Sequence, residues 1–193
     1  MVNTLIDGLQ ERISNAIKIN RSVGIILPGN NYADLMQALF ERMKSRAEDA
    51  WVYVAITRPY EDVVKQFGNF AELRNVRFID CISHAAGISK MDPNCTFIES
   101  PALLEKLMME IMDTFRGLDD GVQKYLVIDS LSSLLIYNDA QIVTEFFTHL
   151  TNRTRLADVH TISLVVEEES SDNVNKIIYL RSDKIIKVRE SFI

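Results

Sequence analysis

A strand-like run, a tight loop and a helix-like run follow one another between residues 23 and 43, and this succession constrains the fold most. Residues 23–27 are apolar and rich in β-branched side chains, which is typical of a buried strand. After a break at residues 28–31, helical spacing resumes with Leu35, Met36, Leu39, Phe40 and Met43. A strand, a short loop and a helix N-terminus are also the layout of a phosphate-binding loop, whose backbone amides point at an anion.

The loop lacks the side chains of a working phosphate-binding loop. Such a loop ends in Gly-Lys-Ser/Thr, and Asn31, Tyr32 and Ala33 hold these places. The layout of a nucleotide site is therefore present without its usual chemistry. The candidate phosphate-loop positions are Pro28, Gly29, Asn30, Asn31, Tyr32, Ala33 and Asp34.

Apolar runs and helical patterns alternate along the rest of the chain. They predict further strands at 51–56, 76–81, 96–99, 124–129 and 160–166, and helices at 4–19, 33–46, 60–67 and 139–156, with another helix opening at Ser100-Pro101. Residues 175–180 and 184–188 predict a C-terminal antiparallel hairpin. The alternation predicts a three-layer α/β fold, with a mostly parallel central sheet flanked by helices. We expect residues 1–193 to form a single domain.

Two of the predicted helices carry apolar residues that we expect to face the core. In the helix after Ser100 these are Leu103, Leu104, Leu107, Met108, Ile111, Met112 and Phe115. In the helix at 139–156 they are Ile142, Val143, Phe146, Phe147 and Leu150. Arg153 and Arg155 suit a solvated helix end, although ring-forming ATPases use such arginines in trans. Residues 167–169 are three glutamates, which we expect to form a solvated exit from the strand before them.

Composition narrows the classes of function. Apolar residues make up 47% of the chain and charged residues 25%, as in an ordinary globular protein. The net charge of −6 argues against a nucleic-acid-binding surface. No apolar run approaches the roughly 20 residues of a membrane span, and the N-terminus lacks a signal-peptide pattern, so we expect a cytoplasmic protein. Cys81 and Cys95 suit free thiols. With His84 they supply three possible metal ligands but no fourth, so we expect no metal site.

The strand at residues 124–129 adds a second signal. It is apolar and ends in Asp129, followed by Ser130, as in a Walker-B element whose carboxylate orients a magnesium ion. With the strand–loop–helix unit, this element makes the chain resemble the RecA-like ATPase core of the KaiC family, which includes archaeal relatives in motility and recombination. The resemblance covers residues 22–190, leaves the N-terminal helix of residues 1–20 outside, and follows the stretches 27–34, 53–63, 125–135 and 160–167.

Compared with that family, the candidate loop is altered. Tyr32 stands where the lysine that holds the β- and γ-phosphates would be. Ala33 stands where a hydroxyl would ligate magnesium, and Asn31 replaces a glycine of the loop. Asp34 adds a carboxylate near the helix start, where it would repel a polyphosphate. The resemblance therefore implies a degenerate Walker A loop.

The position of the catalytic base is altered as well. Thr57 and Arg58 occupy the place of the glutamate that activates water in that family. Of the catalytic parts, only Asp129 with its neighbour Ser130 remains. Losing the lysine, the hydroxyl and the base together argues against ATP hydrolysis, so we expect no enzymatic activity.

Several functions are compatible with these changes. We favour a catalytically inactive KaiC/RecA-like domain, without a cofactor, that acts as a regulatory or scaffolding protein through a protein partner or self-association. The alternative is a nucleotide-binding switch that binds ATP or ADP with magnesium without efficient hydrolysis. A different small molecule stacked on Tyr32, or an enzyme of another kind, also stays open.

Overall fold

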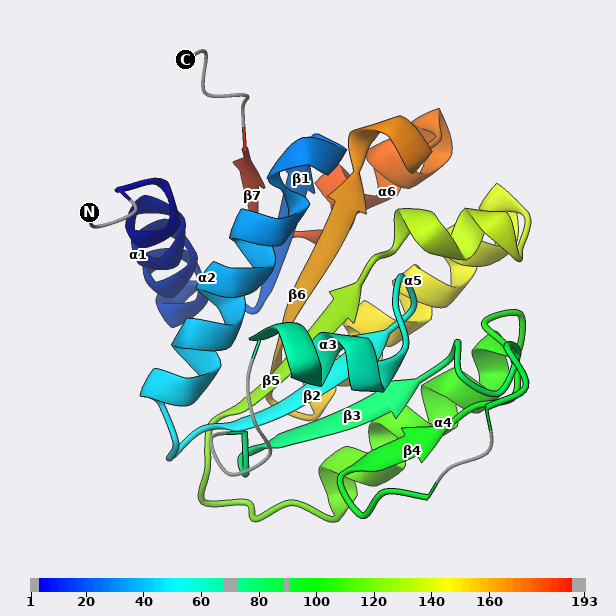
Figure 1. Cartoon of the computed structure of the whole chain (residues 1–193). Coiled ribbons are helices and arrows are strands. Elements are labelled where there is room, and N and C mark those ends of the chain that lie inside the picture. The colour runs from blue at the N-terminus through cyan, green and yellow to red at the C-terminus, as the bar shows by residue number, and fades with distance from the viewer. Residues whose placement is uncertain (1–3, 68–72, 89–90, 189–193) are drawn as a thin grey trace.

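The computed structural model of the chain describes residues 4–67, 73–88 and 91–188, which fold around one seven-stranded sheet (Figure 1). The strands are β1 (Ser22–Leu27), β2 (Ala50–Ala55), β3 (Val76–Asp80), β4 (Cys95–Phe97), β5 (Lys124–Asp129), β6 (Val159–Val166) and β7 (Lys184–Lys187). The helices are α1 (Thr4–Ile19), α2 (Tyr32–Ser45), α3 (Tyr60–Phe67), α4 (Leu104–Arg116), α5 (Ala140–Leu156) and α6 (Asp172–Arg181). Short 3-10 turns, η1 (Gly29–Asn31), η2 (Ser132–Ile136) and η3 (Glu167–Glu169), follow β1, β5 and β6.

The sheet is parallel throughout, with the strand order β4-β3-β2-β5-β6-β1-β7. Parallel neighbours need crossover connections, and helices supply all of them except the one between β3 and β4, whose described residues form bends and turns. The predicted α/β fold, with a central sheet flanked by helices, is confirmed. All strands end at the same edge of the sheet, so the loops that follow them are gathered there.

Helices cover both faces of the sheet (Figure 1). One buried cluster joins α1, α2 and α3 to one face, and a second joins α4, α5 and α6 to the other. Successive strand residues point to opposite faces, so Trp51 and Tyr53 of β2 belong to the first cluster and Val52 and Val54 to the second. Burial on both faces explains why the strands are nearly continuous apolar runs in the sequence.

The predicted C-terminal hairpin is wrong. Residues 175–180 belong to α6, and β7 lies parallel to β1, with Val23 opposite Lys184. Val174 and Ile178 are one helical turn apart and fully buried, whereas Leu180 is 77% exposed. A short apolar run does not by itself distinguish a strand from a helix, and here the crossover between parallel strands is helical.

Close packing around Gly24 brings α6 and β7 against β1. A Cβ atom at this position would lie 2.7 Å from Ile185, 2.8 Å from Ile178 and 2.9 Å from the Ser182 hydroxyl. These separations are shorter than a carbon atom tolerates, so only glycine permits this approach of the three elements.

The prediction for the start of α4 and the prediction that Leu103 and Ile142 face the core are also wrong. The Ser100 hydroxyl accepts a hydrogen bond from the Ala102 amide in a local turn, at 3.2 Å, and α4 begins later at Leu104. Leu103, just before the helix, is 44% exposed, and Ile142 in the first turn of α5 is 47% exposed. Both lie on the outer surface of the helix layer.

The N-terminal helix packs on its own chain, beside α2 and β7 (Figure 1). The Arg12 guanidinium donates to the Lys187 carbonyl at 3.0 Å, and the His160 ring lies 2.8 Å from the Ile17 carbonyl. Burial lowers the pKa of His160 below its usual value. Among the described residues, none of the helices has both the length and the apolar character needed to cross a membrane.

Candidate functional site

The candidate loop, the second predicted strand end and the Walker-B-like strand end converge at the carboxyl edge of the sheet. In the parallel register, Leu27 of β1 lies opposite Val166 of β6, and Ala55 of β2 lies opposite Asp129 of β5. The segments that follow these strands therefore meet, although they are far apart in the sequence. This edge is where open parallel sheets bind their ligands.

Asp129 is the acceptor at the centre of a hydrogen-bonded cluster at this edge. Its side chain is fully buried and accepts hydrogen bonds from three hydroxyl groups. Tyr32 donates to Oδ2 at 2.5 Å, Tyr53 donates to the same oxygen, and Thr57 donates to Oδ1 at 3.3 Å. Burial raises the pKa of Asp129 above its usual value, and the hydrogen bonds from the hydroxyls oppose that shift.

The fold positions both tyrosines tightly. Tyr32 is the first residue of α2, so its ring reaches from the helix start across to the end of β5. Tyr53 lies within β2, between the rings of Phe40 and Phe78 at centroid distances of 5.3 and 5.7 Å. Burial and the neighbouring Asp129 carboxylate raise the pKa of both tyrosines well above the usual value, so both phenols remain hydrogen-bond donors.

Arg58 covers the outer side of Tyr32. Its guanidinium carbon lies 5.2 Å from the centroid of the Tyr32 ring, a distance typical of a cation–π contact. The same guanidinium donates to Gln66 of α3 at 2.5 Å. Thr57 and Arg58, the two residues predicted at the base position, therefore contact Asp129 and Tyr32 respectively.

The Gly29 amide of the candidate loop is bound by a carboxylate from the same chain. Its N–H lies 2.9 and 3.1 Å from the two carboxylate oxygens of Glu168. Glu169 accepts a hydrogen bond from the Ser133 hydroxyl at 2.7 Å. The glutamate run is exposed, as predicted, but Glu168 and Glu169 also bind groups of the same edge, because η3 follows β6 and β6 lies beside β1.

A cluster of serines ties the ends of β5 and β6 together. The hydroxyl of Ser130, a predicted site residue, lies 2.8 Å from that of Ser133 and 3.1 Å from that of Ser132. The Ser132 hydroxyl accepts from the Val166 amide at 3.0 Å. Ser130 therefore serves a buried hydroxyl network beside Asp129.

The other residues of the candidate loop lie in the turn after β1 and in the first turn of α2. Asn31 is buried and its amide donates to the Pro28 carbonyl at 3.0 Å, closing the turn. Asn30 and Ala33 are exposed, and Asp34 is half-buried in the first turn of α2. Among the described residues, His, Cys, Asp and Glu form no group of three that could hold a metal ion, and Cys81 and Cys95 are buried free thiols.

A comparison with known protein families identifies the family of this chain. A model described as a family of unknown function, DUF7504, matches residues 25–180. This chain belongs to the DUF7504 family. No curated protein matches this DUF7504 chain.

Solved structures share the fold of this DUF7504 protein. The uncharacterized protein PH0321 from Pyrococcus horikoshii, in complex with an unknown peptide, has 16% identity and a TM-score of 0.69, over 94% of this chain and 83% of that one. The KaiC-like protein PH0186 from Pyrococcus horikoshii OT3 has 13% identity and a TM-score of 0.60, over 86% and 70%. The flagellar accessory protein FlaH from Methanocaldococcus jannaschii has 16% identity and a TM-score of 0.59, over 92% and 76%. The DUF7504 chain therefore has the RecA-like fold of KaiC-like proteins.

Acidification is expected to stabilise the DUF7504 protein relative to an Asp129→Asn variant. The raised pKa means that the folded chain binds a proton at Asp129 more readily than the unfolded chain does. The stability contributed by protonation is complete below the ordinary pKa of 3.8 and is lost as the pH rises through the raised value. Urea unfolding of both proteins, from neutral pH down toward that ordinary value, measures the difference. A difference that stays constant or shrinks on acidification would contradict the expectation.

Proposed function

We propose that this DUF7504 protein is a KaiC/RecA-like domain with a degenerate Walker A loop, which does not hydrolyse ATP and acts through protein–protein contacts in a regulatory or scaffolding role. One observation carries the proposal. The two groups that a bound nucleotide would use, the loop amide of Gly29 and the carboxylate of Asp129, already have partners from the same chain, Glu168 and Tyr32.

The electrostatics of the edge support this proposal. A phosphate that approaches the Gly29 amide has to displace the Glu168 carboxylate, at an edge of the sheet that also carries the carboxylates of Glu169 and Asp129. In an ordinary phosphate-binding loop, a lysine compensates the charge of the β- and γ-phosphates, and Tyr32 stands at that position. Since the Tyr32 side chain also spans the distance between α2 and Asp129, magnesium and phosphate would have to move it out of the way.

A peptide complex in a protein of the same fold motivates the second half of the proposal. PH0321 was solved in complex with an unknown peptide. We propose that the DUF7504 chain likewise contacts protein, either a partner or another copy of itself. Exposed apolar side chains on α4 and α5 supply a surface for such a contact.

The alternative proposal is a nucleotide-binding switch without efficient hydrolysis, and one observation favours it. The Gly29 N–H already points at an anionic group, the Glu168 carboxylate. A phosphate of ATP or ADP could take the place of that carboxylate, and the Tyr32 hydroxyl would then leave Asp129 to a magnesium ion.

We expect no binding of ATP or ADP at millimolar concentration, with or without magnesium, and no release of phosphate. Titration calorimetry on the purified protein measures binding, and a phosphate assay measures turnover. Micromolar binding without turnover would replace the proposed function with the switch, and turnover would overturn both.

A matched pair of variants tests the role of Glu168. Glu168→Ala frees the Gly29 amide, whereas Glu167→Ala removes a neighbouring exposed charge that, among the described residues, forms no hydrogen bond or ion pair with the loop. We expect inorganic phosphate to shift the Gly29 amide resonance in the first variant and not in the second. Equal responses would show that Glu168 does not block the loop.

A further inference from the structure

One face of α5 carries an exposed stripe that the core does not use. Ile142, Glu145, His149, Arg153 and Leu156 are all exposed, and Leu156 is 90% exposed. At 3.6 residues per turn, these five positions fall within an arc of roughly 80° on the helix surface. We call them the α5 stripe. Two large apolar side chains at its ends are accessible to a partner.

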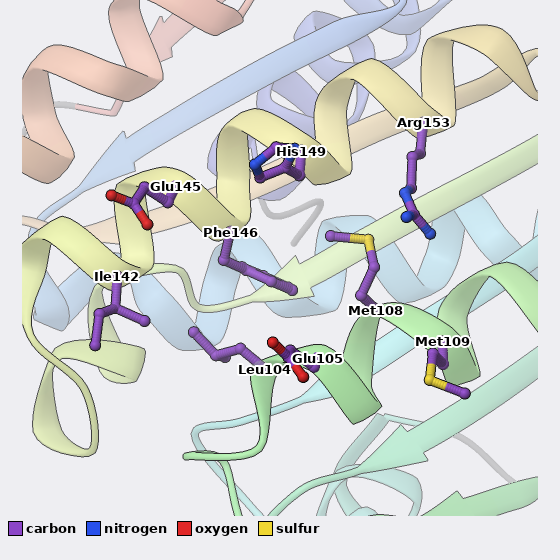
Figure 2. Close-up of a pocket in the computed structure, with 9 residues that line it drawn as sticks. All are labelled: Leu104, Glu105, Met108, Met109, Ile142, Glu145, Phe146, His149 and Arg153. Atoms are coloured by element: carbon purple, nitrogen blue, oxygen red, sulfur yellow. The ribbon is translucent and has the colours of Figure 1, made fainter.

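The α5 stripe borders a groove between α4 and α5. The groove has a volume of about 530 Å³, and its floor includes Met108 of α4 and Phe146 of α5 (Figure 2). Met109, on the α4 side, is 62% exposed. An apolar groove beside an apolar-ended stripe is a surface suited to another helix.

Charge is unevenly distributed along this groove. Glu105 lies in the first turn of α4 and Glu145 in the second turn of α5, and Arg153 lies at the opposite end of the groove, as Figure 2 shows. Within the part of the chain that the structure describes, Arg153 makes no ion pair with any carboxylate. The groove is therefore acidic at one end and basic at the other.

His149 lies at the centre of the α5 stripe. Residues at equal separations on its two sides form complementary pairs, one of opposite charge and one apolar. Glu145 lies four residues before His149 and Arg153 four residues after it, while Ile142 lies seven before and Leu156 seven after. A second copy of the stripe, running antiparallel, therefore matches acid to base and apolar to apolar at every pair. Two-fold dimers have this self-complementary kind of interface.

We propose that two copies of this chain dimerise through antiparallel α5 helices, about a two-fold axis at His149. In that dimer Glu145 faces Arg153 of the partner subunit, and Ile142 faces Leu156 of the partner subunit, each contact occurring twice. The inference rests on the proposed function, since it identifies the protein partner as a second copy. The apolar pairs and the groove against α4 supply contact area, and the charged pairs select the antiparallel orientation.

Reversing the charge at position 145 or 153 tests this dimer, because the two-fold axis makes each charged contact occur twice. Sedimentation velocity over a range of concentrations should show a reversible dimer for the natural chain. Glu145→Arg and Arg153→Glu should each weaken dimerisation about tenfold or more, because each places like charges opposite one another twice. An equimolar mixture of the two variants should regain the dimer, since the introduced arginine then faces the introduced glutamate and native Glu145 faces native Arg153.

Matched controls use another helix. Glu11→Arg and Lys18→Glu make the same charge changes at exposed positions of α1 and should leave the dimer unchanged. Circular dichroism confirms that every variant is folded. All four substituted positions are exposed, so a weakened dimer of a folded variant reports on the interface.

Three outcomes would overturn the inference. They are a natural chain that stays monomeric at every concentration, a dimer that neither reversal weakens, and reversals that weaken the dimer without rescue in the mixture. If either of the last two is found, the chain self-associates through another contact. If the chain stays monomeric, its partner is a different protein. The nucleotide titration tests the proposed function independently of all three.

Discussion

Replacing Asp129 with alanine is expected to lower the free energy of unfolding by about 2–6 kcal/mol. The substitution leaves the hydroxyls of Tyr32 and Tyr53 buried without their acceptor, and each unpaired group costs about 1–3 kcal/mol. Urea unfolding at constant pH measures the change, provided that the transition is two-state.

Two further variants show whether the hydroxyl contacts cause that loss. Asp129→Asn keeps the shape of the side chain and one acceptor oxygen, so it should retain more stability than the alanine variant. Combining Asp129→Ala with Tyr53→Phe should cost less than the sum of the single changes, because the second removes a hydroxyl that the first leaves unpaired. Additive losses would show that the tyrosine and the aspartate do not depend on each other.

A valine at Gly24 is expected to lower the free energy of unfolding by about 3 kcal/mol, because it overpacks a site with no room for a side chain. Its Cβ alone would lie within 2.9 Å of three side chains, Ile178 of α6, Ile185 of β7 and Ser182 in the connection between them. Urea unfolding measures the loss of stability. Hydrogen exchange should show β7 amides opening more often, since β7 lies at the edge of the described sheet, next to β1.

The matched control is Gly8→Ala in α1. Within the described part of the chain, no atom lies within 4 Å of a Cβ atom at Gly8, so the alanine should stabilise the helix by roughly 0.5–1 kcal/mol. A Gly24→Val protein as stable as the natural chain would show that α6 and β7 can move away from β1 without loss.

Much of the fold could be predicted from local sequence patterns. A strand covered on both faces reads as a continuous apolar run, so β1, β2, β5 and β6 are visible in the sequence, and α1 and α5 have clear helical spacing. The errors occur where the local pattern is ambiguous. Residues 175–180 form a short apolar run that suits either a strand or a helix, and only the parallel placement of β7 requires the helix.

The candidate site could be located but its contacts could not be predicted. The sequence identifies Tyr32 and Asp129, because each follows or ends an apolar strand. The bond between them joins positions 97 residues apart, and the bond from Gly29 to Glu168 spans 139 residues. Such contacts depend on which strands are neighbours, which a single sequence does not specify. Tyr53 was missed for a related reason, since a tyrosine within a strand looks like an ordinary core residue.

The two internal partners at the carboxyl edge have a consequence for how such a chain could change in evolution. A lysine introduced at Tyr32 would find the Asp129 carboxylate as a ready partner, while Glu168 still held the Gly29 amide. A change at Glu168 alone would free the amide and leave the tyrosine in place. Freeing both the Gly29 amide and Asp129 therefore requires substitutions on two separate segments of the chain. A single substitution therefore frees only one of these two groups, and the segments that carry Tyr32 and Glu168 have to change together before both are accessible.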